Sequence, residues 1–373
     1  MTDLAKCYDE FIKIENFLNR LVKILSCSFF PRKFFFGFEK YTFLAVLVYY
    51  ISTTISATYY FKGTMLEAIM LIVVGFGSWQ ILIKVLVPLT NENELNQLLF
   101  WIRGLHLNHT FDFVTQAAGT NFKNMQFFIK LFNKIIFPVY FMAAVAVIGY
   151  CVNSNSVIHA IPWIPVRQNE SNIYHHIHQA FVLPSITAIA TPPECFLVTI
   201  GFYFIAIQNV LRDMINHLDD SNLENKKHFL RTVYILHSEI LNSFRIFNDI
   251  YFYVFTVQAV TSSLIIMFLF YIIRIEMSII FVPLILGIYF QFLLLCIFGE
   301  IIYSKTEDIF TNLYLTKWYE FDLSDQKIFL MMMRISQYPF GLKAAGMYDI
   351  NIVMAFKVMK AGFSFCAILY TFT

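Results

Sequence analysis

Charged residues are scarce in this sequence. Aspartate, glutamate, lysine and arginine make up 14% of the 373 residues, and 58% of the residues are hydrophobic. Ordinary globular domains are about 25% charged and about 45–50% apolar. So small a polar fraction cannot cover the surface of a water-soluble fold, which excludes a soluble globular protein.

Catalytic motifs are missing as well. The sequence has no nucleotide-binding glycine loop, no HExxH metal motif and no nucleophile elbow. Its six cysteines show no metal-ligand spacing and fall mostly within apolar stretches, so no disulfide framework is predicted. The neighbouring His175, His176 and His178 are more typical of a solvated loop than of a metal site. We therefore expect no enzyme activity, cofactor, metal site or nucleic-acid partner.

Long apolar runs are what the sequence has in abundance. Each run is close to or longer than the roughly 18 residues with which a helix crosses a hydrocarbon core. A secretory signal is not expected, because the charged segment 1–40 precedes the first run. The sequence predicts an all-α, polytopic membrane protein with seven transmembrane helices at 41–60, 65–89, 135–152, 181–207, 251–273, 278–302 and 350–373.

The distribution of lysine and arginine predicts the orientation. These residues concentrate before the first span and in the loops after the second, fourth and sixth spans, whereas the other loops hold only Lys62, Arg167 and Arg274. Because cytoplasmic segments retain positive charge, we expect a cytoplasmic N-terminus and, with seven spans, an extracellular C-terminus. The sequon at Asn169 falls in an outer loop and is a predicted glycosylation site. A second sequon, at Asn108, falls inside.

Several cytoplasmic segments have the hydrophobic spacing of helices. One such stripe is Phe229, Val233, Leu236, Ile240, Phe244 and Phe247, and another is Leu95, Leu98, Leu99, Ile102 and Leu105. We expect the transmembrane helices to extend below the bilayer and pack into a cytoplasmic anchor, an arrangement that suits an oligomer. The predicted organisation is an N-terminal segment (1–40), transmembrane helices 1–6 (41–303), an anchor segment (304–349) and a seventh helix (350–373).

The N-terminal segment also has helical spacing. Apolar residues recur from Phe11 to Leu25, with Lys13, Arg20 and Lys23 elsewhere on the helix. Two placements fit this pattern equally well. The helix either lies on the membrane surface or packs on the cytoplasmic part of the protein.

Few charges lie inside the apolar runs. Lys84 and Glu300 fall near the inner ends of their spans, where snorkelling explains them as well as function does. Glu194 is the stronger functional candidate, because it follows Pro192 and Pro193 about midway along the fourth span. A proline pair frees backbone carbonyls, so we expect a kinked, polar point there.

The last run has one polar face. Projected as a helix, the residues that share this face are Lys357, Ala361, Ser364, Ile368 and Thr371, with Lys360 and Phe372 at its edges. Such a stripe is costly in lipid and therefore faces protein or water. Two arrangements are open: packing against neighbouring helices through small residues, or a water-filled conduit shared by subunits, which we favour.

The C-terminal third resembles the insect odorant receptor family. The shared features, in order, are Cys296, Gly299, Trp318, Pro339, Ala345-Gly346, Phe356 and the GFSF segment 362–365. The remainder of the chain matches that family in topology, loop lengths and inverted orientation.

This resemblance implies an odorant-gated, non-selective cation channel of four subunits in the plasma membrane of a sensory neuron. The last helix would line the pore, with its gate at Ile368, Leu369, Thr371 and Phe372 and with Ser364 and Lys357 further in. The short loop 208–248 implies an odour-tuning subunit that works with a shared co-receptor in a heterotetramer. Lys357 and Lys360 depart from expectation, since cationic groups beside a cation pathway repel the ions.

The resemblance also implies where a small volatile odorant binds. The pocket would lie in the outer half of each subunit, among the second to sixth spans, and be mostly apolar. The candidates chosen by depth are Val73, Phe76, Ala146, Tyr150, Ser185, Ile189, Phe281 and Leu284. Tyr150 or Ser185 could supply one orienting hydrogen bond, while apolar burial supplies most of the affinity.

Three other classes of membrane protein share some of these features. A G-protein-coupled receptor has seven spans but the opposite orientation. A gustatory receptor channel shares fold and orientation, yet its terminal Thr-Tyr and Gln-Phe signature is absent here. A transporter would need coupled charged groups at mid-membrane, often with internal repeats, and neither is evident.

Overall fold

The computed structural model describes residues 3–26, 41–60, 65–107, 111–166, 172–220, 225–275 and 282–372. These residues are almost entirely helical. The elements are α1 (Asp3–Leu25), α2 (Thr42–Tyr59), α3 (Met65–Thr90), α4 (Glu92–Leu105), α5 (Asp112–Ser154), α6 (Ile173–His217), α7 (Lys226–Ile275), α8 (Val282–Leu315), the 3-10 turn η3 (Trp318–Glu320), α9 (Leu323–Ser336), the two-residue strands β1 (Lys343–Ala344) and β2 (Tyr348–Asp349), and α10 (Ile352–Phe372).

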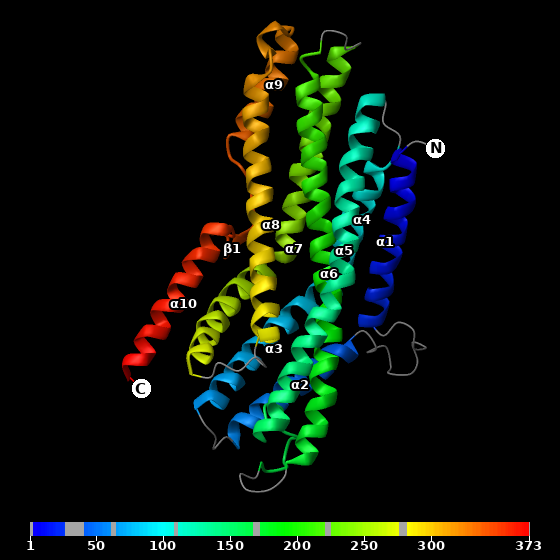
Figure 1. Ribbon diagram of the computed structural model, residues 1–373. Helices are drawn as coiled ribbons and strands as arrows, with labels where there is room; N and C mark the ends of the chain where they lie inside the picture. Colours follow the sequence, from blue (N-terminus) through cyan, green and yellow to red (C-terminus); the bar gives the residue numbers. More distant parts are fainter. Residues whose placement is uncertain are drawn as a thin grey trace.

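The helices form two connected tiers (Figure 1). Helices α5 to α8 run through both tiers. At one end α1, α4 and α9 pack around them, and we call this part the anchor bundle. At the other end α2 and α3 pack against α6 and α7, and we call this part the span bundle. Helix α10 lies at the side, against α7 and α8.

Most predicted spans are matched by helices long and apolar enough to cross a membrane. Among the described residues these helices are α2, α3, α5, α6, α7 and α8. The seventh predicted span is helical as α10, although the side chains after Ile368 lie outside the described set. Helices α5 and α6 contain 43 and 45 residues, far more than a bilayer needs. The predicted extension of the helices beyond the spans is therefore confirmed.

The anchor bundle buries both predicted stripes. Every residue of the α4 stripe and of the α7 stripe belongs to the buried core. Helix α1 packs on α5 and α6 through Leu4, Cys7, Phe11, Ile14 and Leu18, which are all buried. Of the two placements considered for the N-terminal helix, packing on the protein is the one observed.

Polar contacts fix α1 in place. The Gln126 amide donates to the carbonyl oxygen of Cys7 (2.8 Å) and to the Tyr203 hydroxyl (3.0 Å), both in the core. Arg103 of α4 donates to Glu15 of α1 at 2.6 Å. Buried polar groups cost free energy unless they are hydrogen-bonded. These contacts therefore favour one position of α1 on the anchor bundle.

Helices α8 and α10 meet at a glycine. A Cβ atom built on Gly299 would lie 1.8 Å from the carbonyl oxygen of Ile350, just before α10 begins. Only glycine permits this approach of two backbones. The hairpin before α10 turns through Ala345 (φ 52°) and Gly346 (φ 70°), both in the left-handed region.

Candidate functional site

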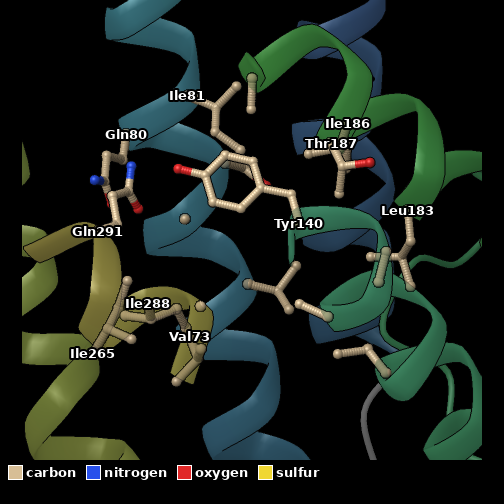
Figure 2. A pocket seen from close by; sticks show the side chains of 18 of the residues that line it. Val73, Gln80, Ile81, Tyr140, Leu183, Ile186, Thr187, Ile265, Ile288 and Gln291 are labelled. Carbon is tan, nitrogen blue, oxygen red and sulfur yellow. The ribbon is translucent and has the colours of Figure 1, made fainter. Parts of the chain in front are cut away.

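A cavity lies within the span bundle, between α3, α5, α6, α7 and α8. Its volume is about 180 Å³, and its walls are mainly aliphatic. Residues from each of the five helices contribute, among them Val73, Val147, Leu183, Ile186, Ile265 and Ile288 (Figure 2). An engineered apolar cavity of about 150 Å³ holds benzene. This cavity therefore suits one aromatic ring or a short aliphatic chain.

The end of the cavity nearer the anchor bundle is polar. Lys84 of α3 and Glu194 of α6 form an ion pair there, and the Gln291 amide of α8 donates to the same carboxylate. Lys84 is 3% exposed and Glu194 4% exposed. Each charge is thus removed from solvent and compensated by the other.

This pairing was not predicted from the sequence. The sequence places Lys84 near an inner helix end, where its side chain could snorkel, but in the structure Lys84 is buried and pairs with Glu194. A complementary pair of charges in two apolar runs was the available signal. The sequence does not fix how deep each residue lies along its span. It therefore could not show that Lys84 and Glu194 lie at the same level and meet. Helix α6 also continues as one element through Pro192 and Pro193, so the proline pair does not end it.

Two further polar groups lie at this end of the cavity. The Tyr140 hydroxyl is buried and lies close enough to the Glu194 carboxylate to interact with it. One end of the Gln80 amide bonds Thr261 (3.3 Å) and the other has no partner among the described residues. Figure 2 shows the Tyr140 hydroxyl directed toward the amides of Gln80 and Gln291.

The predicted ligand residues are scattered around this cavity. Val73 lines it. Tyr150 and Phe76 belong to the hydrophobic cluster of the span bundle rather than to the cavity wall, and Ile189 belongs to a third cluster beside α2. The Ser185 hydroxyl bonds that of Tyr50 at 2.6 Å.

The remaining three ligand candidates are not among the described residues that line the cavity. Ala146 is half-buried on α5 and immediately precedes the lining residue Val147. Phe281 and the side chain of Leu284 lie outside the described residues. The binding assignments of all these residues stay predictions.

The polar stripe of α10 is exposed within a single chain. Lys357 and Ser364 are exposed, and Ile368 is 56% exposed. The face that packs on α7 and α8 is instead formed by small and apolar residues such as Ala355, Val358 and Gly362. Packing of the stripe against helices of the same chain is therefore not observed. The side chains of Leu369, Thr371 and Phe372 lie outside the described residues.

The loop between α5 and α6 is fastened to the span bundle by a histidine. His159 is fully buried, and its Nδ1 lies 3.0 Å and 3.2 Å from the hydroxyls of Thr53 and Thr54 on α2. Both hydroxyls donate to the Tyr50 carbonyl, so they accept from an Nδ1–H of neutral imidazole. Burial lowers the pKa of His159 to about 3, and nearby His178 contributes in the same direction.

The other histidines of this region make ordinary hydrogen bonds. His178 contacts the Tyr49 hydroxyl at 2.9 Å and His176 contacts Asn155 at 3.0 Å. In the part of the chain that the structure describes, no cluster of metal-binding side chains is found. Asn169 and Asn108 lie outside the described residues.

Comparisons with known proteins agree on one family. The model of the 7tm Odorant receptor family matches residues 64–363. Putative odorant receptor 83c of Drosophila melanogaster is 18% identical over 384 residues, which cover 95% of each chain. The insect olfactory receptor OR5 from Machilis hrabei in complex with eugenol has a similar fold, with a TM-score of 0.73 at 15% identity over 98% of this chain and 100% of the other. A second OR5 structure gives a TM-score of 0.71 at 14% identity.

The fold and the spans define a multi-pass membrane protein with a cavity among its helices. The chain belongs to the 7tm odorant receptor family, because the family model spans most of its length. This is a receptor family rather than an enzyme family. The match also favours the odorant receptor branch over the gustatory, G-protein-coupled and transporter alternatives.

Proposed function

We propose that this chain is an odour-tuning subunit of an odorant-gated, non-selective cation channel. A small volatile molecule binds in the cavity between α3 and α5 to α8, and the pore is lined by α10. The subunit works with a co-receptor in a heterotetramer at the plasma membrane of a sensory neuron. The observation that carries the proposal is the mainly apolar cavity of about 180 Å³ in a chain of this family.

Several contacts support a path from the cavity to α10. Gln291 lines the cavity and bonds Glu194, while Tyr289, two residues earlier on α8, contacts the Met359 sulfur of α10 at 2.8 Å. A ligand that moves α8 would therefore act directly on α10. The exposed stripe of α10 fits a surface shared with other subunits.

The test is current recording with and without the co-receptor, against a panel of volatiles. Responses that require both chains support the heteromer, whereas odorant currents from this chain alone would contradict it. Ala143→Leu fills the cavity, because Ala143 lines it. This variant should raise the half-maximal odorant concentration about tenfold or more without changing ion selectivity. Val145→Leu is the matched control, since Val145 is 50% exposed on the outer side of the same helix.

A further inference from the structure

We propose that an open groove beside α1 binds the headgroup of an anionic phospholipid in the cytoplasmic leaflet of the membrane. The groove lies between α1, α3, α4 and α6 and has a volume of about 480 Å³. The described residues that line it are all different from those that line the cavity of the span bundle. The inference therefore goes beyond the proposed function, because it concerns a second site.

The groove lies at the boundary between the anchor bundle and the spans. One side is formed by Pro88, two residues before α3 ends. The last turn of α1 reaches the same level, because Leu25 belongs to one buried cluster with Val85 and Leu89 of α3. Figure 1 shows this end of α1 at the junction of the two tiers. A groove at this level faces lipid headgroups, and the predicted orientation places it on the cytoplasmic side, where anionic lipids are concentrated.

The charges in the groove favour an anion. Arg20 and Lys23 of α1 line it, opposite the single carboxylate of Glu92 on α4. Both cationic side chains are exposed, and Arg20 has no side-chain hydrogen bond or ion pair within the part of the chain that the structure describes. A guanidinium binds a phosphate group through two parallel hydrogen bonds. The groove therefore offers a phosphate one fork-shaped donor and a second positive charge beside it.

The other groups in the groove suit a headgroup that carries hydroxyls. The amides of Asn16, Asn19 and Asn96 line the groove and are exposed. An amide donates and accepts, so it can bond the hydroxyls of an inositol ring as well as phosphate oxygens. Pro88 and Phe196 add apolar surface for the glycerol end of a lipid. The favoured ligand is therefore a phosphorylated inositol phospholipid.

The experiment counts lipids bound to the full-length chain in detergent by native mass spectrometry. Three probes are titrated: dioctanoyl phosphatidylinositol 4-phosphate, dioctanoyl phosphatidylcholine, and inositol 1,4-bisphosphate, the soluble headgroup of the first. The inositol lipid should bind about tenfold more tightly than phosphatidylcholine, because the two cations attract its phosphates. The soluble headgroup should bind more weakly than the inositol lipid, since it has no apolar part to contact Pro88 and Phe196.

Three variants test the groove itself. Arg20→Gln combined with Lys23→Gln removes both cations and should abolish the preference for the inositol lipid. Lys6→Gln combined with Lys13→Gln is the matched control, because it removes the same charge from exposed positions of α1 outside the groove. Asn19→Lys adds a cation to the groove and should tighten binding of the inositol lipid about threefold or more. A misfolded variant would not show such a gain.

Equal binding of the two lipids by the wild type would overturn this inference. A preference that survives the loss of both groove cations, or binding that Asn19→Lys leaves unchanged, would overturn it too. If inositol 1,4-bisphosphate bound as tightly as the inositol lipid, the groove would be a site for a soluble phosphate, and the assignment to the membrane would be wrong. The proposed function would stand in each case, because the odorant cavity has a different lining.

Discussion

At the residue scale, His159 shows how one side chain couples a loop to the bundle. The neutral imidazole can be buried because its Nδ1–H donates to two threonine hydroxyls. Its Nε2 has no partner among the described residues. Protonation would place an uncompensated charge in this site. The pKa of about 3 lies below the ordinary value of 6.5, so the unfolded state binds more protons between these values.

Stability is therefore expected to fall as pH is lowered through this window. His159 contributes no penalty above pH 6.5, and below it the free energy of unfolding should drop by about 1.4 kcal/mol per pH unit until about pH 3. Unfolding midpoints between pH 7.5 and 5 measure the slope, which His159→Asn should flatten. The exposed His228 provides the control, as His228→Asn should not alter it. An unchanged slope in His159→Asn would show that other groups set the acid sensitivity.

At the scale of elements, the joint between α8 and α10 depends on the absence of a side chain. Gly299→Ala would force a Cβ against the Ile350 carbonyl, 1.8 Å away, and shift the start of α10. We expect a loss of about 1–3 kcal/mol or more in the free energy of unfolding, read as a lower unfolding midpoint in detergent. Gly149→Ala on α5 is the matched control, because no atom lies within 4 Å of its Cβ. A stable Gly299→Ala variant would mean that α10 can shift without cost.

The exposed stripe of α10 gives a second prediction about an element. Lys357 lies about 17 Å along the helix from Ile368, on the same face, so in a pore lined by α10 it would border the inner vestibule. Lys357→Gln should raise the single-channel cation conductance of the heteromer, most strongly at low ionic strength, where repulsion is least screened. Phe363→Leu should leave the salt dependence alone, since Phe363 packs on Phe270 of α7 (ring centroids 4.4 Å apart). Unchanged conductance in Lys357→Gln at low salt would assign the stripe to packing between subunits.

At the scale of the whole molecule, orientation is the property to be tested. Lysine and arginine concentrate in the anchor bundle and its connections, which predicts a cytoplasmic N-terminus and an extracellular C-terminus. An epitope tag after Thr373 should be labelled on intact cells, and a tag before Met1 only after permeabilisation. The loop containing Asn169 should acquire an endoglycosidase-sensitive glycan, which Asn169→Gln removes. Labelling of the C-terminal tag only in permeabilised cells would reverse the topology.

The sequence by itself determined the helices and their environment. Length and hydropathy located the spans, and the stripes on α4 and α7 identified an anchor below them, because helical periodicity and membrane thickness are local properties of the chain. The motif glycine at Gly299 was visible too, although the reason for it was not.

Only the tertiary structure decided which residues meet. The Lys84–Glu194 pair joins residues on different helices, and the cavity draws its wall from five helices. Among the predicted ligand residues that the structure describes, Val73 was the one found in that wall, because depth along a span says nothing about the rotation of the helix. Periodicity likewise allowed two placements for α1, and the choice followed from the hydrophobic surface that α5 and α6 present to it. Contacts between distant segments depend on the relative rotation and register of whole helices, which no local pattern specifies.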